Sequence, residues 1–157
     1  MRENEGVADL LPEHVLVFYE NSRRGVAAIR QAVAVAPASA RLTVVTVAVI
    51  ESQGARCCDT RAGYWNGVVR ELAGADLDCA RSLIGGGTTA VFKVLTGESV
   101  LAALTLEARQ SRADMVVVPS GRGVHPWFRA RRARRLQRRA ADAVVVSAPM
   151  CRVRPAG

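Results

Sequence analysis

Five short apolar runs, most of them rich in valine, alternate along the chain with longer stretches of helical character. The first run, 14–19, is continuous rather than alternately apolar and polar, which is typical of a strand buried on both faces of a sheet. When a helix separates each strand from the next, the strands lie parallel and the helices cover both faces. The pattern therefore predicts an α/β fold with a single open five-stranded parallel sheet. The expected strands are 14–19, 42–50, 89–95, 115–118 and 143–147, and the expected helices are 24–35, 64–83, 100–111 and 127–140.

Length and composition fit one domain. The chain has 157 residues, of which 50% are hydrophobic, and this is enough to bury one core. We expect a single domain over residues 10–150, with flexible tails at 1–9 and 151–157. No apolar run reaches the ~18 residues that a membrane helix needs, and the acidic start does not resemble a signal peptide. The four cysteines lack Cys-x-x-Cys spacing, so we expect reduced thiols in a cytoplasmic protein that contacts no membrane.

The places to look for a ligand follow from the predicted sheet. In open parallel sheets, ligands bind beyond the carboxyl ends of the strands. Here these ends are the loops after Tyr19, after Val47 and after Val118. The first of them carries Glu20, followed by Ser22, which offers the side-chain oxygen that a helix N-cap uses.

Four segments resemble the universal stress protein family, in the family's order and spacing. Residues 15–22 resemble its first strand with the Asp-Gly-Ser turn, and Glu20 stands in the Asp position. Residues 42–47 resemble its second strand, and 97–118 resemble its third helix and fourth strand. Residues 140–146 match the last helix and strand, with the prolines of the usual Ala-Pro-x-Pro absent. The resemblance implies a Rossmann-like fold, of the adenine-nucleotide alpha-hydrolase-like kind, over nearly the whole chain.

The phosphate-binding motif of the family is degenerate in this sequence. Members that bind ATP carry Gly-x-x-Gly, nine further residues and then Gly-Ser or Gly-Thr, so that exposed backbone N–H groups surround the phosphates. Here Pro119 stands at the first glycine, which removes a backbone donor and fixes φ. Alignment from the last strand places Ala130-Arg131 at the Gly-Ser pair. We therefore expect no nucleotide cofactor, and ATP or AMP is the alternative.

Part of a binding site nevertheless survives in the sequence. Gly121, Arg122 and Gly123 can form a small nest of N–H groups with a guanidinium beside it, and the resemblance implies that Glu20 holds a ribose hydroxyl. The other interpretation is a glycine-rich turn with no ligand. The candidate nucleotide- or anion-binding residues are Glu20, Ser22, Val47, Ser120, Gly121, Arg122, Gly123 and Arg131.

Positive charge is concentrated near the end of the chain. The net charge is +8, and residues 115–157 hold ten arginines against one acid, Asp142. Most of these arginines fall in the expected helix 127–140, on the side opposite an alanine-rich face. Such a face is either simply solvated or binds an anionic partner, nucleic acid or an acidic protein, through the forked guanidinium groups. The basic surface comprises Arg129, Arg132, Arg134, Arg135, Arg138 and Arg139, with Arg131 beside them.

The sequence favours a regulatory protein over an enzyme. No His, Cys and Asp cluster has metal-ligand spacing, and no Gly-x-Ser-x-Gly elbow is present. The resemblance implies a stress-response protein that does not turn over ATP and that forms a homodimer through the final strand, Val144 to Val146. The alternative is an anion-binding module that uses the arginine helix and the loop Ser120 to Gly123.

Overall fold

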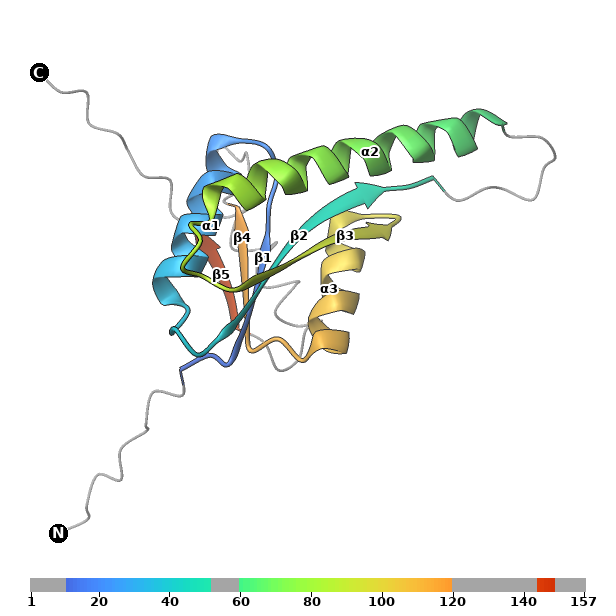
Figure 1. The fold of residues 1–157 in the computed structure, drawn as a ribbon. Coiled ribbons are helices and arrows are strands. Elements are labelled where there is room, and N and C mark those ends of the chain that lie inside the picture. Colours follow the sequence, from blue (N-terminus) through green and yellow to red (C-terminus); the bar gives the residue numbers. More distant parts are fainter. Residues whose placement is uncertain (1–10, 52–59, 120–143, 149–157) are drawn as a thin grey trace, which may run out of the picture.

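The computed structural model describes residues 11–51, 60–119 and 144–148, which form eight helices and strands in strict β–α alternation up to β4 (Figure 1). The elements are β1 (His14–Phe18), α1 (Arg23–Val35), β2 (Arg41–Val49), α2 (Thr60–Leu83), β3 (Ala90–Gly97), α3 (Val100–Ser111), β4 (Met115–Pro119) and β5 (Val144–Ala148).

The strands form one five-stranded sheet in the order β3-β2-β1-β4-β5. Every pair is parallel, and Leu16 of β1 lies opposite Thr43 of β2 on one side and Val116 of β4 on the other. The chain therefore moves outward from β1 in one direction to β3 and then crosses to β4 on the other side of β1. The predicted fold class is confirmed, down to the number of strands.

Helices cover both faces of the sheet, so the fold has two apolar layers. On one face, Val15, Val17 and Val44 pack with Ile29 of α1 and Leu77 of α2. On the opposite face, Leu16, Val45 and Val116 pack with Leu104 and Ala108 of α3. Adjacent residues of β1 thus serve opposite layers, which is why this strand is apolar at nearly every position.

Two predicted boundaries are wrong, both next to the ends of β2 and β3. We expected a loop up to residue 63, but α2 already begins at Thr60, and Ala62 is buried. We expected the third strand to end at residue 95, but Thr96 and Gly97 continue β3 by pairing with Ala48 and Val49 of β2. The predicted helix 127–140 lies outside the described residues.

His14 lies at the amino end of β1 and is buried. Its Nδ1 is 3.0 Å from the carbonyl oxygen of Ser111, and its Nε2 is 2.8 Å from Oγ1 of Thr43. A neutral ring with the proton on Nδ1 satisfies both contacts, because the Thr43 hydroxyl then donates to Nε2. Nη2 of Arg41, which lies 3.2 Å from Nδ1, then donates instead to the Ser111 carbonyl oxygen at 3.4 Å. Burial lowers the pKa of His14 below 6.5, and the nearby Arg41 guanidinium lowers it further, against the opposing effects of the Ser111 carbonyl, Asp114 and Glu107.

This environment predicts acid sensitivity. Because the pKa of His14 is lower in the folded protein than in the unfolded chain, the unfolded chain binds more protons as the pH falls through 6.5. The His14 contribution to stability is therefore fully present above pH 6.5 and is lost below it. Urea unfolding at a series of pH values should show a smaller decline for His14→Gln than for the wild type over this range. Equal declines would contradict the role given to this histidine.

Candidate functional site

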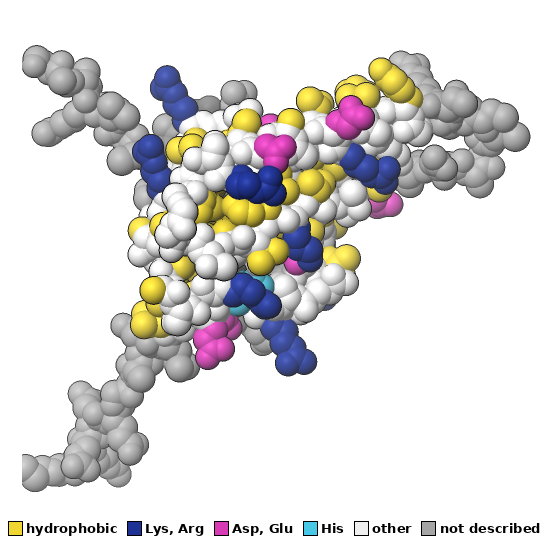
Figure 2. Space-filling model, viewed as in Figure 1, with side chains coloured by type: hydrophobic (Ala, Val, Ile, Leu, Met, Phe, Trp, Pro, Cys, Tyr) yellow, Lys and Arg dark blue, Asp and Glu magenta, His cyan; other side chains and the backbone are white. Residues whose placement is uncertain are grey.

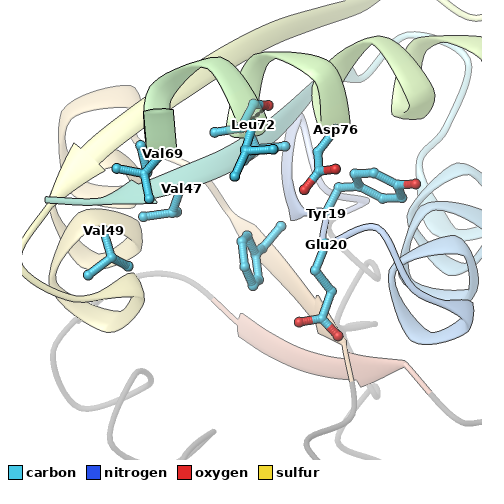
Figure 3. Close-up of a pocket in the computed structure, with 11 residues that line it drawn as sticks. Tyr19, Glu20, Val47, Val49, Val69, Leu72 and Asp76 are labelled. Carbon is cyan, nitrogen blue, oxygen red and sulfur yellow. Dashed lines mark hydrogen bonds between the residues drawn. The ribbon is translucent and has the colours of Figure 1, made fainter. Parts of the chain in front are cut away.

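A cavity of about 250 Å³ lies at the carboxyl ends of β1 and β2, beneath α2 (Figure 3). It exists because β1 ends at Phe18, whereas β2 continues to Val49 and pairs there with β3 rather than with β1. This is the edge of the sheet at which ligands of open parallel sheets bind. The cavity is lined by Phe18, Tyr19, Glu20, Thr46, Val47, Ala48, Val49, Val69, Leu72, Ala73 and Asp76.

The turn from β1 into α1 places Glu20 at the cavity. Ser22 is the N-cap of α1, and its hydroxyl oxygen accepts a hydrogen bond from the backbone N–H of Gly25 at 3.1 Å. The same hydroxyl donates to Oε1 of Glu20 at 2.9 Å. Gly25 packs so closely beneath the turn that a Cβ at this position would lie 1.9 Å from the carbonyl oxygen of Glu20. The turn is therefore fixed by a cap, a side-chain hydrogen bond and a glycine.

Three hydrogen bonds, one of them buried and two partly buried, hold α2 over the end of β2. The Thr46 hydroxyl donates to the carbonyl oxygen of Ala73 at 2.8 Å. The Asn66 side chain, which is 7% exposed, accepts from the N–H of Glu51 and donates to its carbonyl oxygen. This paired contact gives the main chain just beyond β2 the partners that a neighbouring strand would otherwise supply. These bonds thus connect α2 directly to the end of β2, and both elements line the cavity.

The two sides of the cavity differ in polarity. Val47 and Val49 of β2 lie with Val69 of α2 on one side, as Figure 3 shows. The carboxylates of Glu20 and Asp76 lie on the other side, next to Tyr19. No lysine or arginine is among the described residues that line the cavity. The site therefore offers an apolar surface for a flat ring and, beside it, acceptors for hydrogen-bond donors.

Tyr19 lies between the cavity and the core. Its side chain is 2% exposed and belongs to the layer that packs against α1 and α2. Burial raises the pKa of its hydroxyl above 10.0, and Coulomb interactions with Cys79 and Asp76 raise it further. The hydroxyl is therefore protonated at neutral pH, and its ring acts as a rigid support between Glu20 and the helix.

The candidate residues predicted from the sequence fall into three groups. Glu20 and Val47 line the cavity, from opposite sides. Ser22 does not line it, because its hydroxyl caps α1 and bonds Glu20. The remaining candidates lie outside the described residues and stay predictions, as does the basic surface: Ser120, Gly121, Arg122, Gly123, Arg129, Arg131, Arg132, Arg134, Arg135, Arg138 and Arg139.

Elsewhere in the described part of the chain, charges are dispersed. Figure 2 shows lysine and arginine side chains spaced apart on the face in view, some beside acidic ones. Two of them are paired, Arg81 with Asp78 at 2.6 Å and Lys93 with Glu107 at 2.8 Å. The described residues contain no group of three potential metal-ligating side chains.

The described residues also bear on two other sequence predictions. Cys79, the one cysteine among them, is a free and exposed thiol. No helix in the described ranges is both long and apolar enough to cross a membrane.

The sequence reasoning missed the contribution of α2. Asp76, Val69 and Leu72 line the cavity from this helix, whereas candidates were sought only in loops that follow strands. Nothing in the residue spacing of α2 marks which of its turns lines the cavity. The position of Asp76 depends on the path of the crossover, which is set by long-range packing.

Comparison with known proteins identifies the fold. No protein-family model matches the sequence, and a search of curated proteins finds no match. Among solved structures, a universal stress protein family member from Burkholderia pseudomallei superimposes with a TM-score of 0.67 at 22% identity, over 89% of this chain and 98% of that one.

Two further structures contain nucleotides. A universal stress protein in complex with cAMP gives a TM-score of 0.55 at 21% identity, over 88% of this chain and 99% of that one. A family protein from Arabidopsis thaliana with AMP bound gives 0.53 at 16% identity, over 87% and 90%. Each of the three similarities covers 87–89% of this chain. The chain therefore has the fold of the universal stress proteins.

Proposed function

We propose that this chain is a universal stress protein-like regulatory protein of the cytoplasm, which binds the nucleoside part of an adenine nucleotide and does not turn it over. The observation that carries the proposal is the cavity at the carboxyl ends of β1 and β2, with an apolar side at Val47 and a carboxylate at Glu20. A flat base fits the apolar side, and the sugar hydroxyls find acceptors opposite.

The comparisons support this choice of ligand. Two proteins of the same fold were solved with cAMP and with AMP, and both ligands consist of adenosine with one phosphate. The cavity walls of this chain need no triphosphate loop to receive an adenosine. A monophosphate is therefore a better match than ATP to a sequence in which Pro119 replaces the first glycine of the phosphate motif.

The proposal predicts that filling the cavity abolishes binding. We expect the wild type to bind adenosine or AMP in isothermal titration calorimetry. A tryptophan in place of Val47, or in place of Val69 on the same side of the cavity, should weaken binding by about 100-fold or more, because the ring occupies the space of the base. Val47 also packs against the α3 layer, so its replacement can disturb the fold as well as the cavity. The Val69 variant is therefore tested beside it, so that at least one of the two should keep its fold.

The matched control is Val91→Trp. Val91 lies on β3, is 46% exposed and does not line the cavity, so this variant should bind like the wild type.

Chromatography of ATP incubated with the protein should show no hydrolysis. Binding of adenosine by both cavity variants at wild-type affinity would refute the site, and steady release of phosphate would refute the lack of turnover.

We also propose a homodimer through β5. This strand is the last in the sheet order and pairs only with β4 among the described strands, so its other edge is available to a second copy. Analytical ultracentrifugation should find a dimer at micromolar concentration, and a monomer there would refute this assembly.

A further inference from the structure

The face of α2 that lines the cavity continues beyond the residues of the cavity itself. Val69, Leu72 and Asp76 line the cavity from this helix, and Trp65 precedes Val69 by four residues. At about 100° per residue, Trp65 lies within about 40° of each of the three around the helix axis, and about 6 Å nearer the amino end than Val69. Side chains four residues apart are neighbours on a helix surface. Trp65 therefore extends the cavity-lining face of α2 by one turn.

This extension lies beside the end of β2 and is open to solvent. Asn66 exchanges two hydrogen bonds with the main chain of Glu51, which follows the last residue of β2 by two positions. Figure 1 shows the amino-terminal part of α2 continuing beyond this strand. The exposed fraction is 49% for Trp65, 58% for Leu72 and 41% for Val49. Large apolar side chains that stay exposed together at the edge of a cavity are typical of a binding surface.

The proposed position of the nucleoside determines which part of a ligand can reach this surface. Figure 3 shows Glu20 on one side of the cavity and Val47, Val49 and Val69 on the other. In a purine nucleoside the sugar is attached to the five-membered ring, and the six-membered ring forms the opposite end of the base. When the sugar lies toward Glu20, the six-membered ring lies among the valines. A group attached to the outer edge of that ring then leaves the cavity beside Trp65.

We propose that Trp65 is a specificity-determining residue, which stacks on an apolar or aromatic group carried by the six-membered ring of a purine nucleotide. The inference rests on the proposed function, because it uses the same cavity, but it concerns a group that lies beyond the base. An indole packs on flat rings in offset or edge-to-face contact, and exposed Leu72 and Val49 add apolar area beside it. The ligand class is therefore a purine nucleoside or nucleotide substituted at N6 or at position 2.

The expected result is a preference that depends on Trp65. The probe is N6-benzyladenosine, compared with adenosine by isothermal titration calorimetry. The wild-type protein should bind the benzyl compound about 10-fold or more tightly than adenosine, because the added ring leaves water and stacks on the indole. Trp65→Ala should reduce this ratio of affinities toward one. Trp65→Phe should keep most of it, because a smaller aromatic ring still stacks.

Tyr64→Ala is the matched control. It removes a neighbouring aromatic side chain that is 75% exposed, does not line the cavity and lies about 100° from Trp65 around the helix axis. It should leave the ratio unchanged, and thermal unfolding of the variants verifies that each is folded. Fluorescence gives a second measurement, because Trp127→Phe leaves Trp65 as the only tryptophan. Its emission should change more with the benzyl compound than with adenosine.

Two outcomes separate this inference from the function on which it rests. A wild-type ratio near one, or a ratio that Trp65→Ala does not alter, overturns the role of Trp65 and leaves the cavity as the adenosine site. Failure of the wild type to bind either nucleoside overturns the proposed function itself.

Discussion

Replacing Gly25 with alanine should lower the free energy of unfolding by at least about 3 kcal/mol. The added Cβ would lie 1.9 Å from the carbonyl oxygen of Glu20 and 2.9 Å from its carbonyl carbon. Both are backbone atoms of the turn that enters α1, so no side-chain rotation relieves the overlap. Either α1 moves away from β1 or the turn is displaced, and Glu20 with it. Urea unfolding followed by circular dichroism measures the loss.

Gly74→Ala is the control for this change. A Cβ at Gly74 meets nothing within 4 Å, and the position lies inside α2, where alanine is favoured over glycine by up to about 1 kcal/mol. This variant should therefore be as stable as the wild type or slightly more stable. If Gly25→Ala unfolded at the wild-type urea concentration, the close packing of the turn against α1 would be disproved.

Shortening Leu16 to alanine should cost about 2–5 kcal/mol. Leu16 is fully buried at the centre of the sheet and packs in the layer of Val45, Leu104 and Val116. The truncation leaves a cavity that close-packed neighbours on two strands and a helix fill only in part. The same urea titration measures the effect.

Leu106→Ala on α3 provides the comparison. The Leu106 side chain is 56% exposed, and its truncation should change the free energy of unfolding by no more than about 0.5 kcal/mol. Similar losses for the two variants would show that the α3 layer is not packed as the structure indicates.

The sheet was predictable because its signals are local. The apolar runs of β1, β2 and β4 are continuous, and Ser22 and Ser99 cap α1 and α3 where the sequence offers a hydroxyl. Errors arose where tertiary contacts override local preference. Thr96-Gly97 has turn chemistry, yet pairing with the long β2 extends β3 through it.

The site was predictable only in part, for the same reason. Glu20 and Val47 follow or end predicted strands, and the rule that ligands bind at the carboxyl edge of the sheet selects them. Asp76 lies in the second half of a 24-residue helix, and its position at the cavity depends on contacts such as the bond from Thr46 to Ala73. The helical periodicity of a sequence does not determine which turn of the helix lies near the end of a given strand.

The described residues that line the cavity all fall between Phe18 and Asp76, whereas the family-like phosphate motif would begin only at Pro119. The proposed nucleoside site and the phosphate motif are thus encoded in separate stretches of the gene. Mutation can erode the later stretch without disturbing the earlier one. A lineage that loses triphosphate binding in this way still keeps a cavity for nucleosides, which can then evolve to bind a different signalling molecule.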